Sequence, residues 1–494
     1  MADCILVIDE GTTSTRAIAY NRTFEQVAVA QKEIALQYPA DGWVEQNGQE
    51  IWESTLAVCR DVIAQIGGAE KVAAIGITNQ RETTLLWDRA SGEPLAPAII
   101  WQDRRTAAQC EALKAEGHEE LVSDVTGLLL DPYFSGTKLG WLLDEVDGAR
   151  GRAEAGELAF GTVDAYLIYR LTGGAVHATD VTNASRTLLY RLGIDGAGGW
   201  SGEMLELLDI PESVLPDVRP SSGDFGQTDA SLFGRAIPIF SAIGDQQAAL
   251  VGQGCLGEGE AKVTYGTGAF LVANTGKDRP VSSHRLLGTV GYETGAASAY
   301  ALEGAIFNAG TVIQWLRDEL QLITDAAESE RLASELEGNG GAYFVPAFTG
   351  LGAPHWNADA RGQISGLTRG TRSAHIVRAA LESVAYQTRE LLEAFAADGA
   401  GVDLLRIDGG MAANDWLMQF VADICEVPVE RPDYMEMTAL GAAGLAGIAL
   451  GWSDEESWAE RMREVRRFEP KMAADVREGL LAGWDRAVRA SLLS

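Results

Sequence analysis

Hydrophobic residues along this chain form short apolar runs that alternate with stretches of helical spacing. The short runs predict buried strands at residues 5–8, 17–20, 73–78, 83–87, 237–243 and 404–407. Apolar positions recurring at helical spacing predict helices over residues 52–66, 312–322 and 379–395. Strands that alternate with helices are typical of an α/β architecture. We therefore expect sheets covered by helices.

Two predicted hairpins carry turns of the same chemical kind. Residues 9–16, Asp-Glu-Gly-Thr-Thr-Ser-Thr-Arg, separate the first two strands, and residues 263–272 contain Gly266-Thr267-Gly268 between apolar arms. Glycine allows the backbone to approach a ligand closely, and amide and hydroxyl groups can surround phosphate oxygens. Asp9 adds a carboxylate where a phosphate-bound Mg²⁺ would sit. One such turn in each half of the chain predicts two lobes that grip a nucleotide, as in an ATP-dependent enzyme.

Chain length sets the domain organisation. A chain of 494 residues is too long for one core and fits two domains of roughly 200–250 residues each. We expect the boundary near residues 252–259, with a substrate- and phosphate-binding domain over residues 1–252 and a nucleotide-binding domain over residues 253–494. Residues 193–226, rich in Gly, Pro and Ser, are predicted to be an irregular connector.

Composition and charge exclude several classes of function. The net charge of −32 disfavours nucleic acid and anionic membrane surfaces as partners, because both require basic patches. The five cysteines are dispersed and odd in number, which favours reduced thiols over a disulfide framework or zinc site. No signal peptide is visible, and the apolar run at residues 439–452 is too short to span a bilayer. The chain is predicted to be a cytoplasmic enzyme with no membrane insertion.

Charged residues at two predicted strand ends are candidates for chemistry. Arg81 and Glu82 follow the strand at 73–78 and could hold a polyhydroxylated substrate, with Arg81 donating and Glu82 accepting hydrogen bonds. A surface ion pair explains them equally well. Asp245 follows the strand at 237–243 and could deprotonate an alcohol that attacks phosphorus. The alternative is that Asp245 caps a helix, a position that Asp favours.

Many ordered motifs together resemble one family. They lie at residues 9–16, 76–84, 101–105, 133–138 with 141, 161–164, 179–187, 244–250, 264–270, 302–307, 344–356, 361–371, 382–389, 408–414 and 438–447. With them the chain resembles the FGGY carbohydrate kinases, and among these the members that act on glycerol. The resemblance implies an α/β fold of two actin-like (ribonuclease H-like) ATPase domains, each a mixed sheet flanked by helices, with the active site in the cleft between them. It also implies Mg²⁺-dependent phosphoryl transfer from ATP to glycerol, giving sn-glycerol 3-phosphate. We expect the protein to be a homo-oligomer (dimer or tetramer).

The same resemblance assigns roles residue by residue. Glycerol would be bound by Arg81, Glu82, Tyr133, Asp245 and Gln246, with Trp101 and Phe270 on either side of its carbon chain. The nucleotide would be held by Thr12, Thr13, Ser14, Arg16, Thr267, Gly310, Gln314, Gly410 and Asn414. Asp9 and Asp245 would orient Mg²⁺, and Asp245 would be the catalytic base.

The chain departs from the family pattern in two places, and two rival functions stay open. Glu10 stands where Gln is frequent, and residues 228–235 lack a glycine-rich loop and a histidine, so inhibition by a sugar bisphosphate and histidine phosphorylation are not expected. One rival is an FGGY kinase for a pentulose, hexulose or gluconate, which would change the neighbourhood of Arg81, Glu82 and Trp101. The other is an actin-like filament or chaperone ATPase, which would lack an alcohol site.

Overall fold

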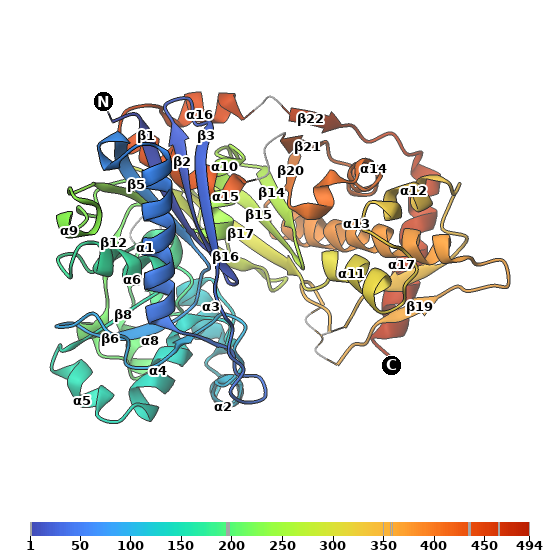
Figure 1. The fold of residues 1–494 in the computed structure, drawn as a ribbon. Coiled ribbons are helices and arrows are strands. Elements are labelled where there is room, and N and C mark those ends of the chain that lie inside the picture. The colour runs from blue at the N-terminus through green and yellow to red at the C-terminus, as the bar shows by residue number, and fades with distance from the viewer. Residues whose placement is uncertain are drawn as a thin grey trace.

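The chain forms two lobes, each built around one large sheet. A computed structural model describes residues 2–493 except 194–197, 349, 356, 358, 433–435 and 463–464. Figure 1 shows the blue and green N-terminal elements in the first lobe, on the left, and most of the orange and red elements on the right, except α15 (Met437–Ala449) and α16 (Glu455–Arg461), which lie beside the first lobe. The yellow-green strands of the second sheet lie between them.

The first lobe contains a mixed sheet in the order β13-β5-β1-β2-β3. Its strands are β1 (Cys4–Glu10), β2 (Ser14–Asn21), β3 (Gln26–Glu33), β5 (Val72–Asn79) and β13 (Ile239–Gly244). β1 pairs antiparallel with β2 and parallel with β5, and β5 pairs parallel with β13. The ends of the three parallel strands therefore bring the residues after them to one edge of the sheet.

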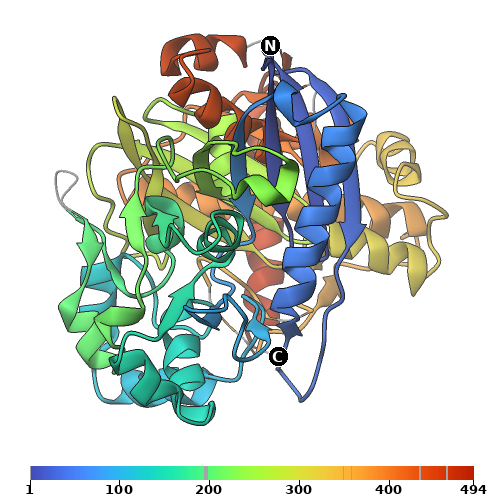
Figure 2. The same ribbon diagram turned by 60° about the vertical axis from the view of Figure 1, so that its left-hand side comes forward.

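Alternating side chains of β1 bury both faces of this sheet. Leu6 and Ile8 pack into a cluster with helix α1 (Gly48–Gln65), whereas Ile5 and Val7 pack with helices α10 (Asp245–Gly252) and α15 (Met437–Ala449). Successive side chains on a strand point to opposite faces, so a strand covered on both sides is apolar throughout. Figure 2 shows α1 lying along the blue strands.

The second lobe repeats this arrangement in a larger sheet, ordered β16-β17-β15-β14-β20-β21-β22. Its strands are β14 (Glu260–Tyr265), β15 (Ala269–Gly276), β16 (Leu287–Glu293), β17 (Ser298–Ile306), β20 (Leu404–Asp408), β21 (Val429–Pro432) and β22 (Val465–Phe468). β14 corresponds to β1, because it pairs antiparallel with the next strand and parallel with the strand that follows a long helix. The predicted α/β architecture of two mixed sheets flanked by helices is confirmed.

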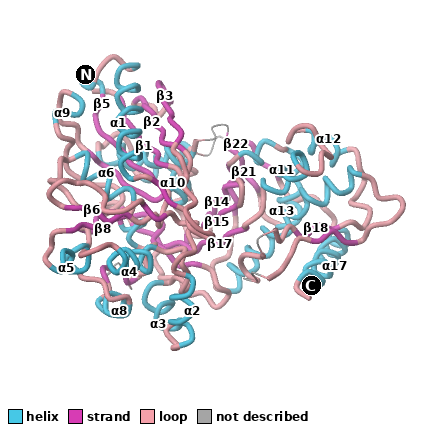
Figure 3. The backbone as a smooth tube through the Cα atoms, turned by 60° about the horizontal axis from the view of Figure 1, so that its bottom comes forward, coloured by secondary structure: helices cyan, strands magenta, loops and turns pink. Residues whose placement is uncertain are grey.

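The remaining helices and small strand pairs surround the two sheets (Figure 3). The helices are α2 (Ala107–Ala115), α3 (Glu119–Thr126), α4 (Ser135–Glu145), α5 (Ala149–Glu154), α6 (Val163–Leu171), α7 (Val181–Ala184), α8 (Gly202–Leu207), α9 (Ala230–Phe233), α11 (Gly310–Asp318), α12 (Glu328–Ser334), α13 (Ser373–Ala397), α14 (Asp415–Cys425), α16 (Glu455–Arg461) and α17 (Ala474–Ser491). The strand pairs are β4 (Glu45–Gln46) with β7 (Ala98–Ile99), β6 (Leu85–Asp88) with β8 (Leu158–Gly161), β9 (Ala178–Asp180) with β12 (Asp217–Arg219), β10 (Tyr190–Arg191) with β11 (Gly199–Trp200), and β18 (Tyr343–Val345) with β19 (Gln363–Ser365). None of the described helices is both long and apolar enough to cross a membrane.

Three expectations about secondary structure need correction. Residues 193–226, expected to be irregular, contain β11, α8 and β12, while 194–197 lie outside the described residues. Ser201 begins α8 by accepting a hydrogen bond from the Met204 amide, and the buried Met204 and Leu205 anchor it. The helix expected over 312–322 ends at Asp318, and the one expected over 379–395 extends over Ser373–Ala397. Capping and packing, which apolar spacing does not show, set these ends.

Candidate functional site

The first hairpin turn joins β1 and β2. One hydrogen bond within the turn and two from outside the hairpin hold it. The amide of Gly11 donates to the Ser14 carbonyl (3.0 Å), which closes the turn. Trp101 Nε1 donates to Thr12 Oγ1 (3.0 Å), and Gln46 Nε2 donates to the Thr12 carbonyl (2.6 Å). The Thr13 side chain remains exposed. The turn therefore presents hydroxyl groups on a backbone that cannot move freely.

Two acidic residues precede this turn, and their surroundings differ. Asp9 is almost buried and forms an ion pair with Arg16 (2.5 Å), which also pairs with Glu436 (2.5 Å). Burial raises the pKa of Asp9, and Arg16 opposes that shift. Burial raises the pKa of Glu10 well above its usual value. The Thr15 hydroxyl donates to it and opposes this shift, but no cation among the described residues pairs with it. Protonation, which this direction of shift favours, would give Glu10 a donor as well as an acceptor, as a Gln side chain has.

Asp245 is the first residue of α10, directly after β13. Gly244 occupies the N-cap position, so the interpretation of Asp245 as the helix cap is wrong. Its Oδ1 lies 3.1 Å from Arg81 Nε and accepts a hydrogen bond from the Gln246 amide (2.7 Å), and about a third of its side chain (32%) is exposed. Asp245 is thus held mainly through Oδ1, with a longer hydrogen bond from Gln246 Nε2 to Oδ2 (3.4 Å), while part of its side chain stays accessible to solvent.

Arg81 and Glu82 lie inside the protein, so the surface ion pair is also excluded. They are only 3% and 1% exposed, and their closest charged atoms are 3.9 Å apart. Each has a closer partner: Arg81 pairs with Glu303 (2.5 Å), and Glu82 accepts from Arg186 Nε (2.6 Å). Buried charges of this kind are stable only when paired.

The backbone at Glu82 adopts a conformation that side chains with a Cβ rarely take. Its φ is +58°, in the left-handed region. Three donors hold its carbonyl oxygen: Thr84 Oγ1 (3.0 Å), Ser135 Oγ (3.0 Å) and Lys138 Nζ (3.5 Å). A backbone conformation of this kind persists where the surrounding structure holds it in place, and such positions cluster at functional sites.

Three aromatic rings form a wall beside these polar groups. The Trp101 ring lies 5.8 Å from Tyr133 and 6.4 Å from Phe270, both in edge-to-face geometry. Trp101 and Tyr133 belong to the first lobe, and Phe270 lies on β15 of the second. Gln246 joins the lobes as well, since Lys262 Nζ on β14 donates to its Oε1. The structure therefore brings together all seven residues predicted to bind the alcohol.

The second lobe contains a cavity of about 510 Å³ that begins at the turn between β14 and β15. Its lining includes five of the predicted nucleotide contacts: Thr267, Gly310, Gln314, Gly410 and Asn414. A Cβ on Gly310 would lie 2.5 Å from the Gly266 carbonyl oxygen, so only glycine permits this contact between the turn and α11. The other four predicted contacts (Thr12, Thr13, Ser14 and Arg16) lie on the first hairpin.

Asp9 and Asp245 are the two carboxylates of the first lobe that could hold Mg²⁺. They interact electrostatically, since the charge of Asp245 contributes to the raised pKa of Asp9. No cluster of three or more His, Cys, Asp or Glu side chains suited to a metal occurs among the described residues. Mg²⁺ is commonly held by one or two carboxylates together with water and substrate phosphates. The two aspartates fit such an ion and would not suit zinc.

Family comparison agrees with this geometry. Models of the FGGY family of carbohydrate kinases match the chain over residues 4–252 for the N-terminal domain and 261–450 for the C-terminal domain. The chain belongs to the FGGY family of carbohydrate kinases. It is 56% identical to glycerol kinase of Methylobacterium nodulans, covering 99% of this chain and 98% of the relative, and 55% identical to glycerol kinase of Rhodospirillum centenum, covering 98% and 97%.

Solved FGGY structures share the fold along the whole chain. Plasmodium falciparum glycerol kinase with ADP superposes with a TM-score of 0.94 at 36% identity, covering 99% of this chain and 98% of that one. A xylulose kinase from Lactobacillus acidophilus superposes with a TM-score of 0.88 at 22% identity over the same shares, which shows the fold alone.

Sequence reasoning missed several buried side chains of this FGGY site. Glu303 contacts Arg81 and Arg186, Lys262 contacts Gln246, and Lys138 holds the Glu82 carbonyl. Glu303, Arg186 and Lys138 lie inside motifs 302–307, 179–187 and 133–138, which was a signal for importance but not for a role. Their partners are distant in sequence, so only the fold shows the contacts.

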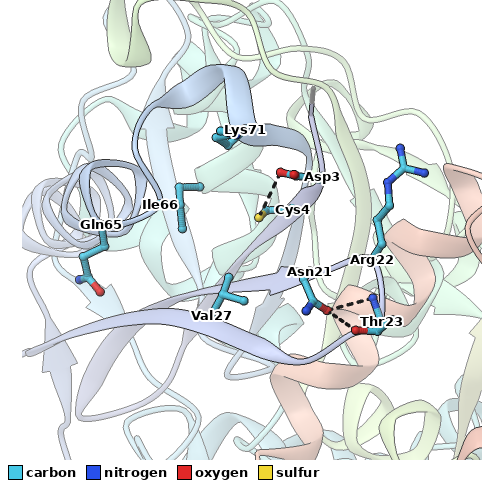
Figure 4. Close-up of a pocket in the computed structure, with 9 residues that line it drawn as sticks. All are labelled: Asp3, Cys4, Asn21, Arg22, Thr23, Val27, Gln65, Ile66 and Lys71. Atoms are coloured by element: carbon cyan, nitrogen blue, oxygen red, sulfur yellow. Dashed lines mark hydrogen bonds between the residues drawn. The ribbon is translucent and has the colours of Figure 1, made fainter.

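A further hollow, of about 590 Å³, lies at the opposite end of β1 (Figure 4). Asp3, Cys4, Asn21, Arg22 and Lys71 are among its lining residues. The hydrogen bonds drawn there join near neighbours in sequence, Cys4 to Asp3 and Thr23 to Asn21. It contains none of the predicted site residues.

Proposed function

We propose that this protein is a glycerol kinase, which transfers the γ-phosphoryl group of ATP to glycerol and releases sn-glycerol 3-phosphate and ADP. The observation that carries the proposal is the position of Asp245, which lies in contact with Arg81 at the meeting point of the two lobes. The identity of 53–56% to curated glycerol kinases over almost the whole chain supports the choice of alcohol.

The alcohol would lie between the polar cluster and the aromatic wall. Arg81 donates hydrogen bonds, the Glu82 and Asp245 carboxylates accept them, and Tyr133 and Gln246 can do both. Trp101 and Phe270 would lie against the carbon atoms. A site with such dense hydrogen bonding disfavours analogues that lack a hydroxyl, because the buried groups would be left unpaired.

ATP would span both lobes. Its adenosine part would occupy the 510 Å³ cavity with Gly310, Gln314, Gly410 and Asn414 at the wall. Thr267 would face the phosphates from the second lobe, and Thr12, Thr13, Ser14 and Arg16 from the first. This division supports two functional domains over residues 1–252 and 253–494.

Asp9 and Asp245 would hold Mg²⁺, which would neutralise charge on the phosphate oxygens. Asp245 is also the general base. The glycerol oxygen attacks the γ-phosphorus, its proton passes to the Asp245 carboxylate, and the bond from phosphorus to the bridging oxygen breaks, leaving ADP. Arg81 keeps the carboxylate of Asp245 aimed at the hydroxyl, and closure of the lobes excludes water that would compete as the acceptor.

Release of ADP across a panel of alcohols tests this function. Glycerol should give a kcat/KM at least roughly 100-fold above those of D-xylulose and D-gluconate, because their longer chains would clash with the Trp101–Phe270 wall. A higher kcat/KM with either sugar would support the rival FGGY activity. Nucleotide-dependent light scattering without any alcohol kinase activity would support the filament ATPase.

Two finer properties complete the proposal. We place the protein in the cytoplasm, supported by five free and buried cysteines. We also propose a homo-oligomer (dimer or tetramer), for which light scattering of the purified protein in solution gives the mass directly.

A further inference from the structure

Glu303 connects the two lobes beneath the candidate glycerol site. It lies on β17 of the second sheet and is fully buried, yet both residues that form ion pairs with it, Arg81 and Arg186, belong to the first lobe. Its two oxygens accept from Arg81 Nη1 (2.5 Å) and Nη2 (3.1 Å), a bidentate arrangement. Oε1 also accepts from Arg186 Nη2 (3.1 Å).

The cluster of Arg81, Arg186, Glu82 and Glu303 contains two positive and two negative charges away from water, and the buried Lys262 adds a further positive charge that acts on Glu303. Burial opposes ionisation of Glu303, but Arg186 and Arg81 outweigh it and lower its pKa to about 2. Arg186 bridges the two carboxylates, with Nε on Glu82 and Nη2 on Glu303. Removing the charge of Glu303 would leave two buried guanidinium groups with one buried carboxylate.

Glu303 also determines how Arg81 faces Asp245. Both η nitrogens donate to Glu303, and Nε forms the ion pair with Asp245 (3.1 Å). Arg81 Nη1 makes one further bond, to Gln247 Oε1 (3.1 Å), and its side-chain stem lies so close to Gly244 that a Cβ there would be 2.7 Å from it. Without Glu303, the guanidinium of Arg81 would be free to form a bidentate pair with the Asp245 carboxylate. That pair would occupy the oxygens that glycerol needs.

We propose that Glu303 is a positioning residue for the alcohol site: it holds Arg81 and Arg186 across the lobes, orients Glu82 and keeps Asp245 accessible to the substrate. This inference rests on the proposed function, because it concerns the same site. It adds a residue of the second lobe that does not touch the substrate itself.

Glu303→Gln tests the inference, because Gln preserves the shape but not the charge. The KM for glycerol should rise at least roughly tenfold, and the dissociation constant for glycerol measured by calorimetry should rise in parallel. The KM for ATP should stay within about twofold, since the cavity of the second lobe is separate from the cluster. Glu303→Asp, which retains the charge, should recover part of the glycerol affinity.

Glu382→Gln is the matched control. Glu382 is also fully buried in the second lobe, and it pairs with Arg378 (2.8 Å) and accepts from Asn339 (2.8 Å). The Glu382→Gln variant should have a lower thermal stability, because a buried ion pair is broken, but no selective loss of glycerol affinity. The inference would be overturned if folded Glu303→Gln bound glycerol normally, or if its KM values for glycerol and ATP rose together.

Two further results keep the test decisive. If Glu303→Gln does not fold, the same comparison of the two KM values on Glu303→Asp decides the question, and an unselective change overturns the inference. If the wild-type protein phosphorylates another alcohol in preference to glycerol, the proposed function fails while the inference is tested with that alcohol.

Discussion

Gly441 of α15 lies against the carbonyl oxygen of Ala248 in α10, so closely that a Cβ on Gly441 would be 1.9 Å from that oxygen. The contact is reciprocal, since a Cβ on Gly252 would lie 1.9 Å from the Met437 carbonyl oxygen. Helix α10 begins with Asp245, so a helix from the C-terminal part of the chain fixes the helix that carries the candidate base. Small residues at helix crossings allow backbones to approach in this way.

Gly441→Ala should therefore destabilise the protein and disturb catalysis together. Overpacking at such a contact costs about 1–3 kcal/mol or more, and the resulting shift of α10 moves Asp245. We expect a lower thermal midpoint and a lower kcat. Gly479→Ala in α17 is the control: no atom lies within 4 Å of its Cβ position, so this change should stabilise the helix by about 0.5–1 kcal/mol without affecting kcat. Equal stability of the two variants would contradict the packing argument.

Asp245→Asn should reduce kcat by at least roughly 100-fold, because the amide cannot accept the proton of the hydroxyl. Glycerol affinity should fall less, since Arg81, Glu82 and Tyr133 remain. Asp164→Asn is the comparison: Asp164 is buried and accepts from Thr162 (2.5 Å) and Thr179 (2.7 Å), a structural role. Steady-state kinetics of both variants decide the assignment. Near-normal kcat in Asp245→Asn together with abolished activity in Asp164→Asn would refute it.

Gly310→Ala should weaken nucleotide binding selectively. The added Cβ would meet the Gly266 carbonyl at 2.5 Å and push the turn that carries Thr267 away from α11. We expect the KM for ATP to rise several-fold while the KM for glycerol changes little. Gly338→Ala, with no atom within 4 Å of its Cβ position, should leave both values unchanged. A rise confined to the KM for glycerol would argue against the cavity as the nucleotide site.

The local sequence pattern was sufficient to predict the positions of the central strands and of the residues that follow them. β1 and β2 are apolar on both faces, so their position and the turn between them could be read from short runs of residues. Asp245 and Arg81 could be placed at strand ends for the same reason. The family resemblance then supplied roles that composition and spacing do not contain.

Contacts between distant segments could not be predicted in this way. Glu303 is separated from Arg81 by 222 positions, and nothing in the residues around either one indicates the pairing. The φ of +58° at Glu82 is imposed by Thr84, Ser135 and Lys138 rather than by a local preference for a turn residue. The close crossing of α10 and α15 likewise depends on two sheets that meet only in the folded protein.

His177 should make the first lobe sensitive to acid. Its Nε2 donates to the Phe160 carbonyl (2.8 Å), its ring packs edge-on against Trp87 (5.3 Å), and burial lowers its pKa from 6.5 to about 4. Between pH 4 and 6.5 the unfolded chain binds a proton that the folded chain does not, so stability falls as the pH falls through this window. The full effect is about 3 kcal/mol.

His177→Gln keeps a donor for the Phe160 carbonyl but cannot be protonated, so its thermal midpoint should fall less between pH 6.5 and 4 than that of the wild type. His118→Gln, at a partly exposed position before α3, is the matched control. Parallel pH profiles for wild type and His177→Gln would show that another group causes the loss.

Binding of both substrates should bring the lobes closer together. The proposed phosphate contacts, Thr13 on the first hairpin and Thr267 on the second, are both exposed, whereas Arg81 and Glu303 already join the lobes beneath the site. Because the buried contact between Arg81 and Glu303 lies below the two exposed turns, a small rotation of one lobe about this contact would bring the turns together. This closure would exclude water from the phosphoryl group during transfer. Small-angle scattering should show a smaller radius of gyration with glycerol and a non-hydrolysable ATP analogue together than with either alone. Thr267→Ala should weaken this compaction, because it removes the hydroxyl contact from the second lobe. An identical radius of gyration in every ligand state would mean that the site works without closure, with both hairpins already in contact range of the phosphates.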